Sequence, residues 1–299
     1  MSKTGLPLAQ RQLTIVGLGL MGGSLAMALR RKCAGITAVD IDDRALRAGL
    51  QRGTIDHATE ILAEGVERAD LLVLATPVYV IIELLAQLSQ LPPRSEETLP
   101  VLDLGSTKVE ITTAMAALPD QYNCIGGHPM CGKESSGLAY ADGEIFRQAA
   151  FVLTPLAKTS SATLELTREL ILAVGARPLQ MEASRHDRLV ALTSHLPYLL
   201  ACSLVATVEQ HGNDDPGVRD LLSTGFRDTT RVAASDVRML SDILRSNRQS
   251  VRAALGQQRR ALLALEAALD GDAATLQAAL CAIQAARLSH FPPTITESE

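Results

Sequence analysis

The sequence predicts an α/β fold, in which a doubly wound sheet occupies the first half of the chain and an all-α domain follows. Short apolar runs alternate with helix-forming segments until about residue 182, and no convincing strand follows Ser184. The first strand-to-helix turn is rich in glycine. With 299 residues, 47% of them hydrophobic, the chain is long enough for two cores. We therefore expect one domain at residues 1–182 and a second at residues 183–299.

The first strand leads directly into a glycine-rich loop. The apolar run Leu13–Val16 is followed by Gly17-Leu18-Gly19-Leu20-Met21-Gly22, the helix-forming segment Ser24–Arg31, and a second strand, Ile36–Val39, that ends at Asp40. This order is typical of Rossmann-like dinucleotide-binding domains, whose glycines permit a tight turn, close approach of a pyrophosphate and close packing of the helix. The alternative is a glycine-rich turn that binds nothing.

The acidic residue after the second strand indicates which dinucleotide is bound. The carboxylate of Asp40 suits the diol of a ribose, whereas a 2′-phosphate at the same place would meet a like charge. The sequence therefore predicts NAD rather than NADP as the cofactor, with its phosphates at the amino end of the first helix.

Two further strand ends carry polar residues. The apolar run that ends at Ala75 is followed by Thr76-Pro77, and the run that ends at Leu104 is followed by Gly105-Ser106-Thr107-Lys108. The serine and threonine fit the N-cap of the next helix, and spacing alone favours that role. The functional alternative is that Ser106 faces the same crevice as the first glycine-rich loop.

A second glycine-rich stretch, Gly126–Gly137, carries a histidine. It reads Gly-Gly-His-Pro-Met-Cys-Gly-Lys-Glu-Ser-Ser-Gly and follows the strand-like run Tyr122–Ile125. We expect His128 on a stiff turn at the strand end, because Pro129 biases the residue before it towards an extended conformation. An ordinary loop histidine is the plainer alternative. No metal is expected, since His128 and two nearby cysteines lack a fourth ligand.

The second half of the chain is expected to be helical. Arg185–Gln210 has helical spacing, which Pro197 should kink, and Asp236–Leu269 reads as one long helix or as two joined near Gly256. Apolar stripes on these helices fit either a homodimer formed through this domain or an internal core.

Three groups of residues suit chemistry beside the cofactor. They are His128, the segment Ser194-His195-Leu196-Pro197-Tyr198, and the pair Arg227 and Arg231, which share one face if their segment is helical. A neutral imidazole suits removal of a hydroxyl proton, and a guanidinium suits a carboxylate. The residues alone indicate an NAD-dependent oxidoreductase acting on a small acid. Spacing alone favours a core role for His195.

Composition disfavours several other classes of protein. A net charge of −5 does not favour nucleic acid or an anionic membrane as a partner. Five scattered cysteines without a CxxC pair fit a reducing, cytoplasmic compartment. No apolar run is expected to reach the roughly 18 residues that span a bilayer.

Taken together, the motifs resemble the prephenate/arogenate (cyclohexadienyl) dehydrogenase family of tyrosine biosynthesis. The resemblance covers roughly Leu13 to Leu288 and implies a Rossmann-like domain, a helical dimerisation domain and an active site between them. The matching segments, in family order, are Val16–Ser24, Ala75-Thr76-Pro77, Asp103–Lys108, Gly127-His128-Pro129-Met130 through Gly137, His186-Asp187, Ser194-His195-Leu196-Pro197 and Gly225-Phe226-Arg227-Asp228-Thr229-Thr230-Arg231.

The reaction that this resemblance implies is the oxidative decarboxylation of prephenate to 4-hydroxyphenylpyruvate. By the resemblance, His128 accepts the hydroxyl proton while hydride passes to the nicotinamide, and Ser106 bonds the same hydroxyl or positions His128. The resemblance further implies that Arg227 holds a carboxylate. The other residues that it assigns are Ser194, His195, Tyr198 and Arg231 for the substrate pocket, and Thr76 and Pro77 for the cofactor.

One departure from the family pattern bears on the substrate. Many prephenate-preferring members read His-Leu-Pro-His, and Tyr198 replaces the second histidine here. Arogenate dehydrogenase, or a dual-specificity cyclohexadienyl dehydrogenase, is therefore the alternative. A hydroxyacid dehydrogenase would need a lysine in the helical domain, and the chain has none after Lys158. A non-catalytic, NAD-sensing binding protein is the remaining alternative.

Overall fold

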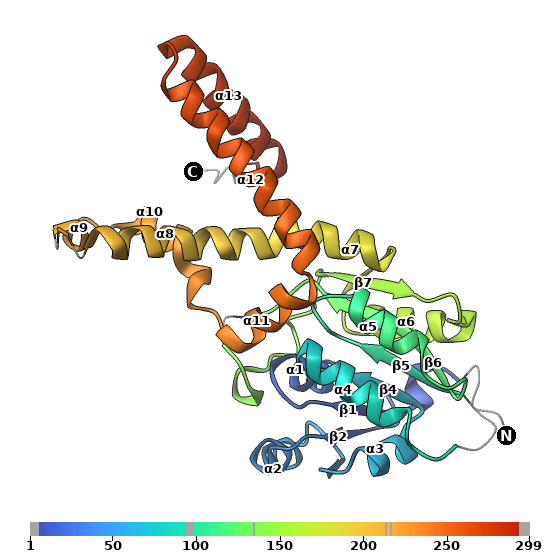
Figure 1. The fold of residues 1–299 in the computed structure, drawn as a ribbon. Helices are drawn as coiled ribbons and strands as arrows, with labels where there is room; N and C mark the ends of the chain where they lie inside the picture. The colour runs from blue at the N-terminus through green and yellow to red at the C-terminus, as the bar shows by residue number, and fades with distance from the viewer. Residues whose placement is uncertain (1–5, 94–97, 134, 213, 216, 293–299) are drawn as a thin grey trace, which may run out of the picture. The chain divides into compact units, whose positions relative to one another are not determined.

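The computed structural model describes residues 6–93, 98–133, 135–212, 214–215 and 217–292 (Figure 1). Glu134, which belongs to the second glycine-rich stretch, lies outside the described residues. By their internal contacts the residues form two compact units, 1–248 and 249–299, and each is described by itself. The predicted boundary at residues 182 and 183 stays a prediction.

The first unit is built on a single sheet, which in the described part of the chain has eight strands in the order β3-β2-β1-β4-β5-β6-β7-β8. All neighbouring strands are parallel except β6 and β7, which are antiparallel. The strands are β1 (Gln12–Val16), β2 (Gly35–Val39), β3 (His57–Thr59), β4 (Leu71–Leu74), β5 (Leu99–Asp103), β6 (Tyr122–Pro129), β7 (Ala150–Pro155) and β8 (Arg177–Gln180).

Helices cover both faces of this sheet, because the strand residues alternate between two apolar cores. In β4, Leu71 and Val73 belong to the core under α1 (Leu20–Leu29), α2 (Asp43–Gln51) and α6 (Ser161–Ala173). Leu72 and Leu74 belong to the core under α3 (Leu62–Arg68), α4 (Val78–Leu88) and α5 (Val109–Ala116). The doubly wound sheet is confirmed, and so is the helical domain that follows it.

The helical region begins with one continuous helix of changing geometry. It comprises α7 (Ala183–Val190), the π-helical segment η3 (Ala191–His195) and α8 (Leu196–Gly212). A proline inside an α-helix clashes with the carbonyl four residues earlier. The wider π turn lies directly before Pro197, at the point where the sequence predicts a kink, and π segments of this kind are frequent at functional sites.

The remaining helices are short in the first unit and long in the second. They are α9 (Gly217–Asp220), α10 (Thr224–Thr230), η4 (Arg231–Ala234), α11 (Val237–Ser246), α12 (Arg248–Leu269) and α13 (Ala273–His290). The expected long helix over Asp236–Leu269 is therefore broken at Asn247, not near Gly256. On α11, Ile243 is buried in the core under α4 and α5, so this helix is anchored on the sheet domain.

The expectation about membrane-spanning segments was wrong for one stretch. Between Arg188 and Glu209 the chain has no Asp, Glu, Lys or Arg. The helix Ala183–Gly212 is thus long and apolar enough to cross a membrane by length and composition alone, and only 28% of its most apolar window is buried. His, Ser, Thr and Pro interrupt the apolar run, which is why it does not read as one in the sequence.

Three further details differ from the sequence-based expectations. The first helix begins at Leu20, inside the glycine-rich loop, rather than at Ser24. Strand β6 continues to Pro129, since His128 pairs with Val152 and Pro129 with Phe151 in the antiparallel neighbour. His128 therefore lies within a strand rather than on a turn.

A buried ion pair joins the end of β5 to the start of α5 and to β6. Asp103 and Lys108 are fully buried, and the Lys108 ammonium pairs with the Asp103 carboxylate and donates to the carbonyl of Gly127 at 2.5 Å. The same carboxylate accepts the N–H groups of Gly105 at 2.8 Å and Gly127 at 3.0 Å. Burial raises the pKa of Asp103 and lowers that of Lys108, and each charge opposes the shift of the other.

We expect Lys108→Met to lower the free energy of unfolding by about 3–5 kcal/mol, because it leaves the carboxylate of Asp103 buried without its counter-ion. Urea denaturation followed by circular dichroism measures the loss. Lys158→Met is the matched control, since Lys158 pairs with Asp120 at 2.9 Å on the surface and an exposed pair contributes about 1 kcal/mol or less. Equal losses in the two variants would show that the buried pair has no special role.

Candidate active site

The Gly17–Gly22 loop has the backbone geometry that close approach of a ligand requires. Gly17 has a φ of +95°, and a Cβ there would lie 2.7 Å from Cγ2 of Thr76. A Cβ on Gly22 would lie 1.8 Å from the carbonyl oxygen of Gly17, so this glycine lets α1 pack against the loop. Gly19 differs from both, because a Cβ there meets nothing within 4 Å. The loop is therefore tight inside and open at Gly19, where α1 begins without a side-chain cap.

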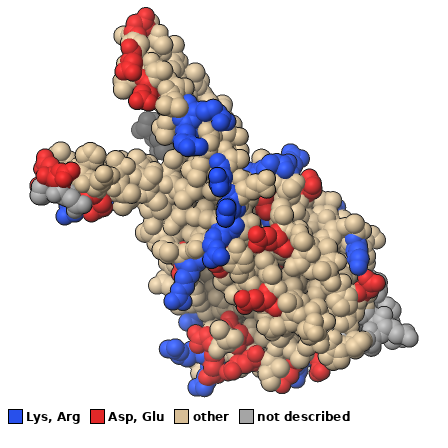
Figure 2. Space-filling model, viewed as in Figure 1, with Lys and Arg blue, Asp and Glu red and all other residues tan. Residues whose placement is uncertain are grey.

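The carboxylate of Asp40 lies beside this loop. It accepts the N–H of Leu18 at 2.5 Å and the N–H of Asp42 at 2.9 Å, so it is fixed at the carboxyl end of β2. The nearest basic residues along the chain, Arg44 and Arg47, contact Asp42 and Asp43 at 3.6 and 3.0 Å. Figure 2 accordingly shows acidic and basic side chains side by side over this part of the surface.

A third feature of the loop is a polar atom without a partner. The hydroxyl of Thr76 is buried and has no hydrogen-bond partner among the described residues. Thr76 follows β4, next to Gly17, at the point where the strand order turns from β1 to β4. Open sheets of this kind bind ligands at such a switch point, and the open Gly19, the fixed carboxylate and the free hydroxyl all fit a dinucleotide there.

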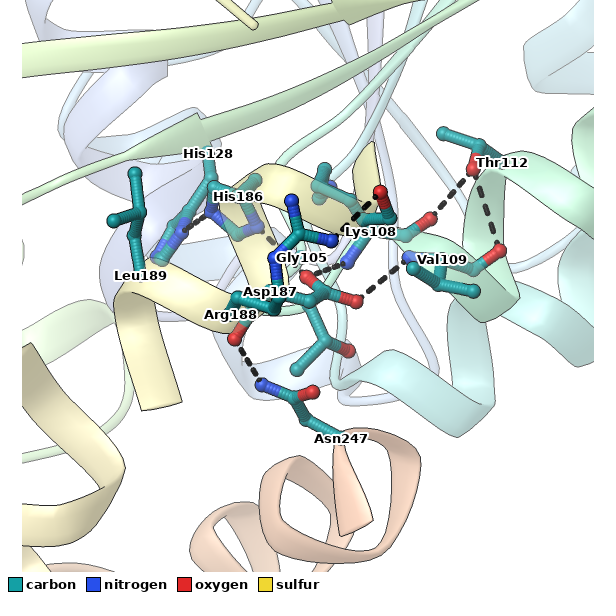
Figure 3. A network of polar contacts seen from close by, with 12 residues as sticks. Gly105, Lys108, Val109, Thr112, His128, His186, Asp187, Arg188, Leu189 and Asn247 are labelled. Carbon is teal, nitrogen blue, oxygen red and sulfur yellow. Dashed lines mark hydrogen bonds and ion pairs between the residues drawn. The ribbon is translucent and has the colours of Figure 1, made fainter. Parts of the chain in front are cut away.

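The sequence-predicted catalytic histidine is joined to two residues of α7 (Figure 3). Nδ1 of the half-buried His128 lies 2.8 Å from Nε2 of His186, and Nδ1 of His186 lies 2.7 Å from Oδ1 of Asp187. Both α7 residues are buried, at 1% and 2% exposure. The carboxylate of Asp187 also accepts the N–H of Lys108 at 2.7 Å and of Val109 at 2.9 Å, at the amino end of α5. We call His128, His186 and Asp187 the histidine chain.

The surroundings of His128 keep its imidazole neutral. Burial lowers its pKa well below the ordinary value of 6.5, and the neighbouring His186, Lys108 and His195 lower it further. A neutral imidazole has one lone pair free to accept a proton, so His128 has the protonation state of a general base at neutral pH.

His195 occupies a second buried position close to the histidine chain. It is 2% exposed, and its Nδ1 lies 3.3 Å from Nδ2 of Asn247. Burial lowers the pKa of His195 to about 4, against an opposing effect of Asp187. The same Asn247 amide donates to the main-chain oxygen of Asp187 at 2.7 Å, so one side chain joins α7 to the end of α11 (Figure 3).

The serine and tyrosine candidates are placed differently. Ser106 is half-buried in the loop between β5 and α5. The N-cap residue of α5 is Lys108, and the carboxylate of Asp187 accepts the N–H groups at that helix end, so the N-cap role favoured by spacing for Ser106 and Thr107 is wrong. The buried Thr107 instead contacts the hydroxyl of Ser246 at 2.8 Å. Ser194 is exposed in the π turn. Tyr198 is half-buried, and burial and the thiol of Cys202 raise its pKa.

The arginine candidates lie on a different part of the helical region. Arg227 is on α10, which packs on α8, and its Nε contacts the carboxylate of Asp228 at 3.2 Å. Figure 1 shows α10 along the half of α8 that is remote from α7. Arg231 begins η4, so the two arginines are not on one continuous α-helix. In the described part of the chain, α10 packs on α8 and η4, and no hydrogen bond joins Arg227 to the histidine chain.

Four residues at the site received no role from sequence reasoning: Lys108, His186, Asp187 and Asn247. The first three lie in segments that carry the family resemblance, so the motifs pointed to them without indicating their contacts. Asn247 lies inside a segment that reads as a helix, and its sequence surroundings carry no signal. Across the described ranges, no three His, Cys, Asp or Glu side chains group as a metal site would require.

Comparisons with known proteins agree on one family. The model of the prephenate dehydrogenase nucleotide-binding domain matches residues 25–180, and that of the prephenate dehydrogenase dimerization domain matches residues 182–280. The chain is 35% identical over 240 residues to a prephenate dehydrogenase of Bacillus subtilis, with 79% of this chain and 64% of that protein covered. The chain thus spans slightly less than two thirds of that relative's length.

Two further comparisons cover more of the related protein. A cyclohexadienyl dehydrogenase of Zymomonas mobilis is 31% identical over 244 residues, which are 79% of this chain and 81% of that one. A crystal structure of the Aquifex aeolicus prephenate dehydrogenase, in complex with hydroxyphenyl propionate and NAD+, superposes with a TM-score of 0.87. It is 29% identical in sequence and covers 95% of this chain and 99% of that one.

Substitution of two glycines of the loop separates its packing role from its open side. We expect Gly22→Ala to lower the free energy of unfolding by about 1–3 kcal/mol, because its Cβ would overlap the carbonyl of Gly17. Gly19→Ala should change stability by less than about 1 kcal/mol, since its Cβ meets open space. Thermal and urea unfolding of both variants check this, and a Gly19→Ala loss as large as that of Gly22→Ala would contradict the geometry.

Proposed function

Because the chain belongs to the prephenate dehydrogenase family, we propose that it is an NAD-dependent prephenate dehydrogenase of tyrosine biosynthesis, which converts prephenate to 4-hydroxyphenylpyruvate by oxidative decarboxylation. The observation that carries this proposal is a neutral His128 at the same sheet edge as the glycine-rich loop. Strands β1, β4, β5 and β6 are parallel, so His128, near the carboxyl end of β6, and Gly17, after β1, belong to one edge.

In this proposal the glycine-rich loop binds the cofactor, and His128 accepts the substrate proton. The Gly17–Gly22 backbone, Asp40, Thr76 and Pro77 hold the cofactor, and NAD, when bound, accepts the hydride that leaves C4 of the substrate ring. His128 takes the proton of the hydroxyl on the same carbon, and Ser106 bonds that hydroxyl or positions the imidazole. Carbon dioxide leaves from the ring carboxylate, and formation of the aromatic ring supplies driving force that the protein need not provide.

The remaining site residues are proposed to contact the substrate. Arg227 is proposed to bind a carboxylate, because its guanidinium is exposed and its ion pair, within the described residues, is with the adjacent and equally exposed Asp228. Ser194, His195, Tyr198 and Arg231 complete the proposed pocket. A buried neutral His195 offers a hydrogen bond without adding charge.

We propose that the protein is a cytoplasmic homodimer that associates through its helical domain. Support comes from apolar side chains that the single chain leaves exposed. In the second unit, α13 has no buried residue, and α12 buries only Val251, Ala254 and Ala268. Exposed apolar residues of this unit are Leu262, Leu263, Leu269, Leu280, Ile283, Leu288 and Phe291. Burial of such a surface by a second copy is favourable.

Tyr198 keeps arogenate as an alternative substrate, since it replaces a histidine near the substrate side chain. The deciding measurement is NADH formation from prephenate and from arogenate, each with NAD and with NADP. We expect turnover with prephenate and NAD, and little with NADP because of the fixed carboxylate of Asp40. Turnover with arogenate alone would move the substrate assignment. Absence of turnover with both acids, despite NADH binding, would favour the NAD-sensing alternative.

The pKa of His128 gives the proposal a pH signature. The base must be neutral to accept a proton, so kcat/KM should fall as the pH drops through that pKa. Because burial and the positive or imidazole groups around it (His186, Lys108 and His195) lower the pKa, we expect this fall well below pH 6.5. His128→Asn should lose about 10²–10⁴-fold in kcat. A fall centred near or above pH 7, or one retained in His128→Asn, would assign the titration elsewhere.

A further inference from the structure

In a hydrogen-bonded chain of imidazoles, the group at the end of the chain determines which ring nitrogen of each histidine carries a hydrogen. Asp187 lies at that end, and each of its carboxylate oxygens already accepts an N–H group of α5, Oδ1 from Lys108 at 2.7 Å and Oδ2 from Val109 at 2.9 Å. Oxygens that accept in this way have no hydrogen to donate, so Nδ1 of His186, 2.7 Å from Oδ1, carries the hydrogen of that contact.

The next link follows from the first. With a hydrogen on Nδ1, a neutral His186 has its lone pair on Nε2, which therefore accepts from its neighbour at 2.8 Å. That neighbour is Nδ1 of His128, so the hydrogen of a neutral His128 lies on Nδ1. Nε2 of His128 is left with the lone pair, and in the described part of the chain no protein group is hydrogen-bonded to it.

We propose that Asp187 and His186 are positioning residues that fix the tautomer of His128 and thereby make Nε2 the atom that accepts the substrate proton. The inference rests on the proposed role of His128 as the base. Neither residue touches the substrate in this proposal. Asp187 also stabilises the positive charge that the chain gains when His128 is protonated, because it is buried and fixed by α5.

The fold explains why this carboxylate is rigid. Asp187 is held by the amino end of α5 on one side, and its main-chain oxygen accepts from Asn247 at 2.7 Å on the other. The ring planes of His128 and His186 meet at 74°, with centroids 5.0 Å apart, so the two imidazoles are not stacked and make contact through the nitrogen atoms at their edges. This orientation directs one ring nitrogen of each residue at the other.

Substitutions at His186 test the tautomer without disturbing the cap on α5. In His186→Gln the amide oxygen can still accept from Nδ1 of His128, whereas His186→Leu offers no acceptor. We expect kcat to fall about 10–100-fold in His186→Leu with an unchanged KM for NAD, and to recover to within about tenfold of wild type in His186→Gln. Asp187→Ala, which removes the acceptor, should resemble His186→Leu. Its control is Asp272→Ala, which removes a carboxylate cap (2.7 Å to the N–H of Thr275) from α13 in the second unit.

A measurement that needs no substrate separates this inference from the proposed function. Nitrogen-15 NMR of the full-length enzyme with labelled histidine, assigned by loss of the signal in His128→Asn, shows which ring nitrogen of His128 is protonated. We expect hydrogen on Nδ1 in the wild type and in His186→Gln, and a mixture of tautomers in His186→Leu. Hydrogen on Nε2 of wild-type His128 would overturn the inference, as would equal kcat in the Gln and Leu variants. If NMR shows hydrogen on Nδ1 of His128 but the enzyme does not turn over prephenate or arogenate, the proposed function is wrong and the tautomer assignment still holds.

Discussion

The carboxylate of Asp187 is the interaction on which the candidate site depends. It satisfies two N–H groups that the amino end of α5 would otherwise leave open, and it bonds the imidazole of His186. Because α5 follows β5 and α7 follows β8, this one group joins two parts of the chain that are about eighty residues apart in sequence. A buried carboxylate with three donors is well satisfied, which is the condition under which charge is tolerated out of water.

The buried ion pair of Lys108 and Asp103 likewise joins separate parts of the chain. Lys108 and Asp103 fix the turn after β5 against the backbone of Gly127, the residue before His128. The position of the candidate base is therefore set from two sides, by backbone contacts through β6 and by side-chain contacts from α7. Desolvation in this region also lowers the pKa values of His128 and His195, which favours their neutral forms.

The sequence predicted those parts of the structure that depend on residues close together in the chain. The glycine-rich loop, Asp40 and the alternating apolar runs needed only neighbouring residues, and they led to the sheet and to the cofactor loop. The extension of β6 through His128 was missed because it depends on pairing with β7, more than twenty residues later. The contacts of His186 with His128 and of Asn247 with Asp187 span 58 and 60 residues, and the hydrophobic periodicity of the sequence does not predict contacts at such separations. The N-cap interpretation of Ser106 and Thr107 failed for the same reason, since a carboxylate from a distant helix occupies that role.

The π-helical turn before Pro197 also determines how the face of α7 is rotated about the helix axis relative to the face of α8. Successive residues of an α-helix are rotated by about 100°, so a turn with a different number of residues offsets the face of α7 from the face of α8. The side of the helix that carries His186 is thereby set against the sheet, while a different side of α8 is left for other contacts. An insertion or deletion of one residue between His186 and Pro197 would rotate one face relative to the other. The length of this short segment therefore sets the orientation of the α7 face relative to the α8 face.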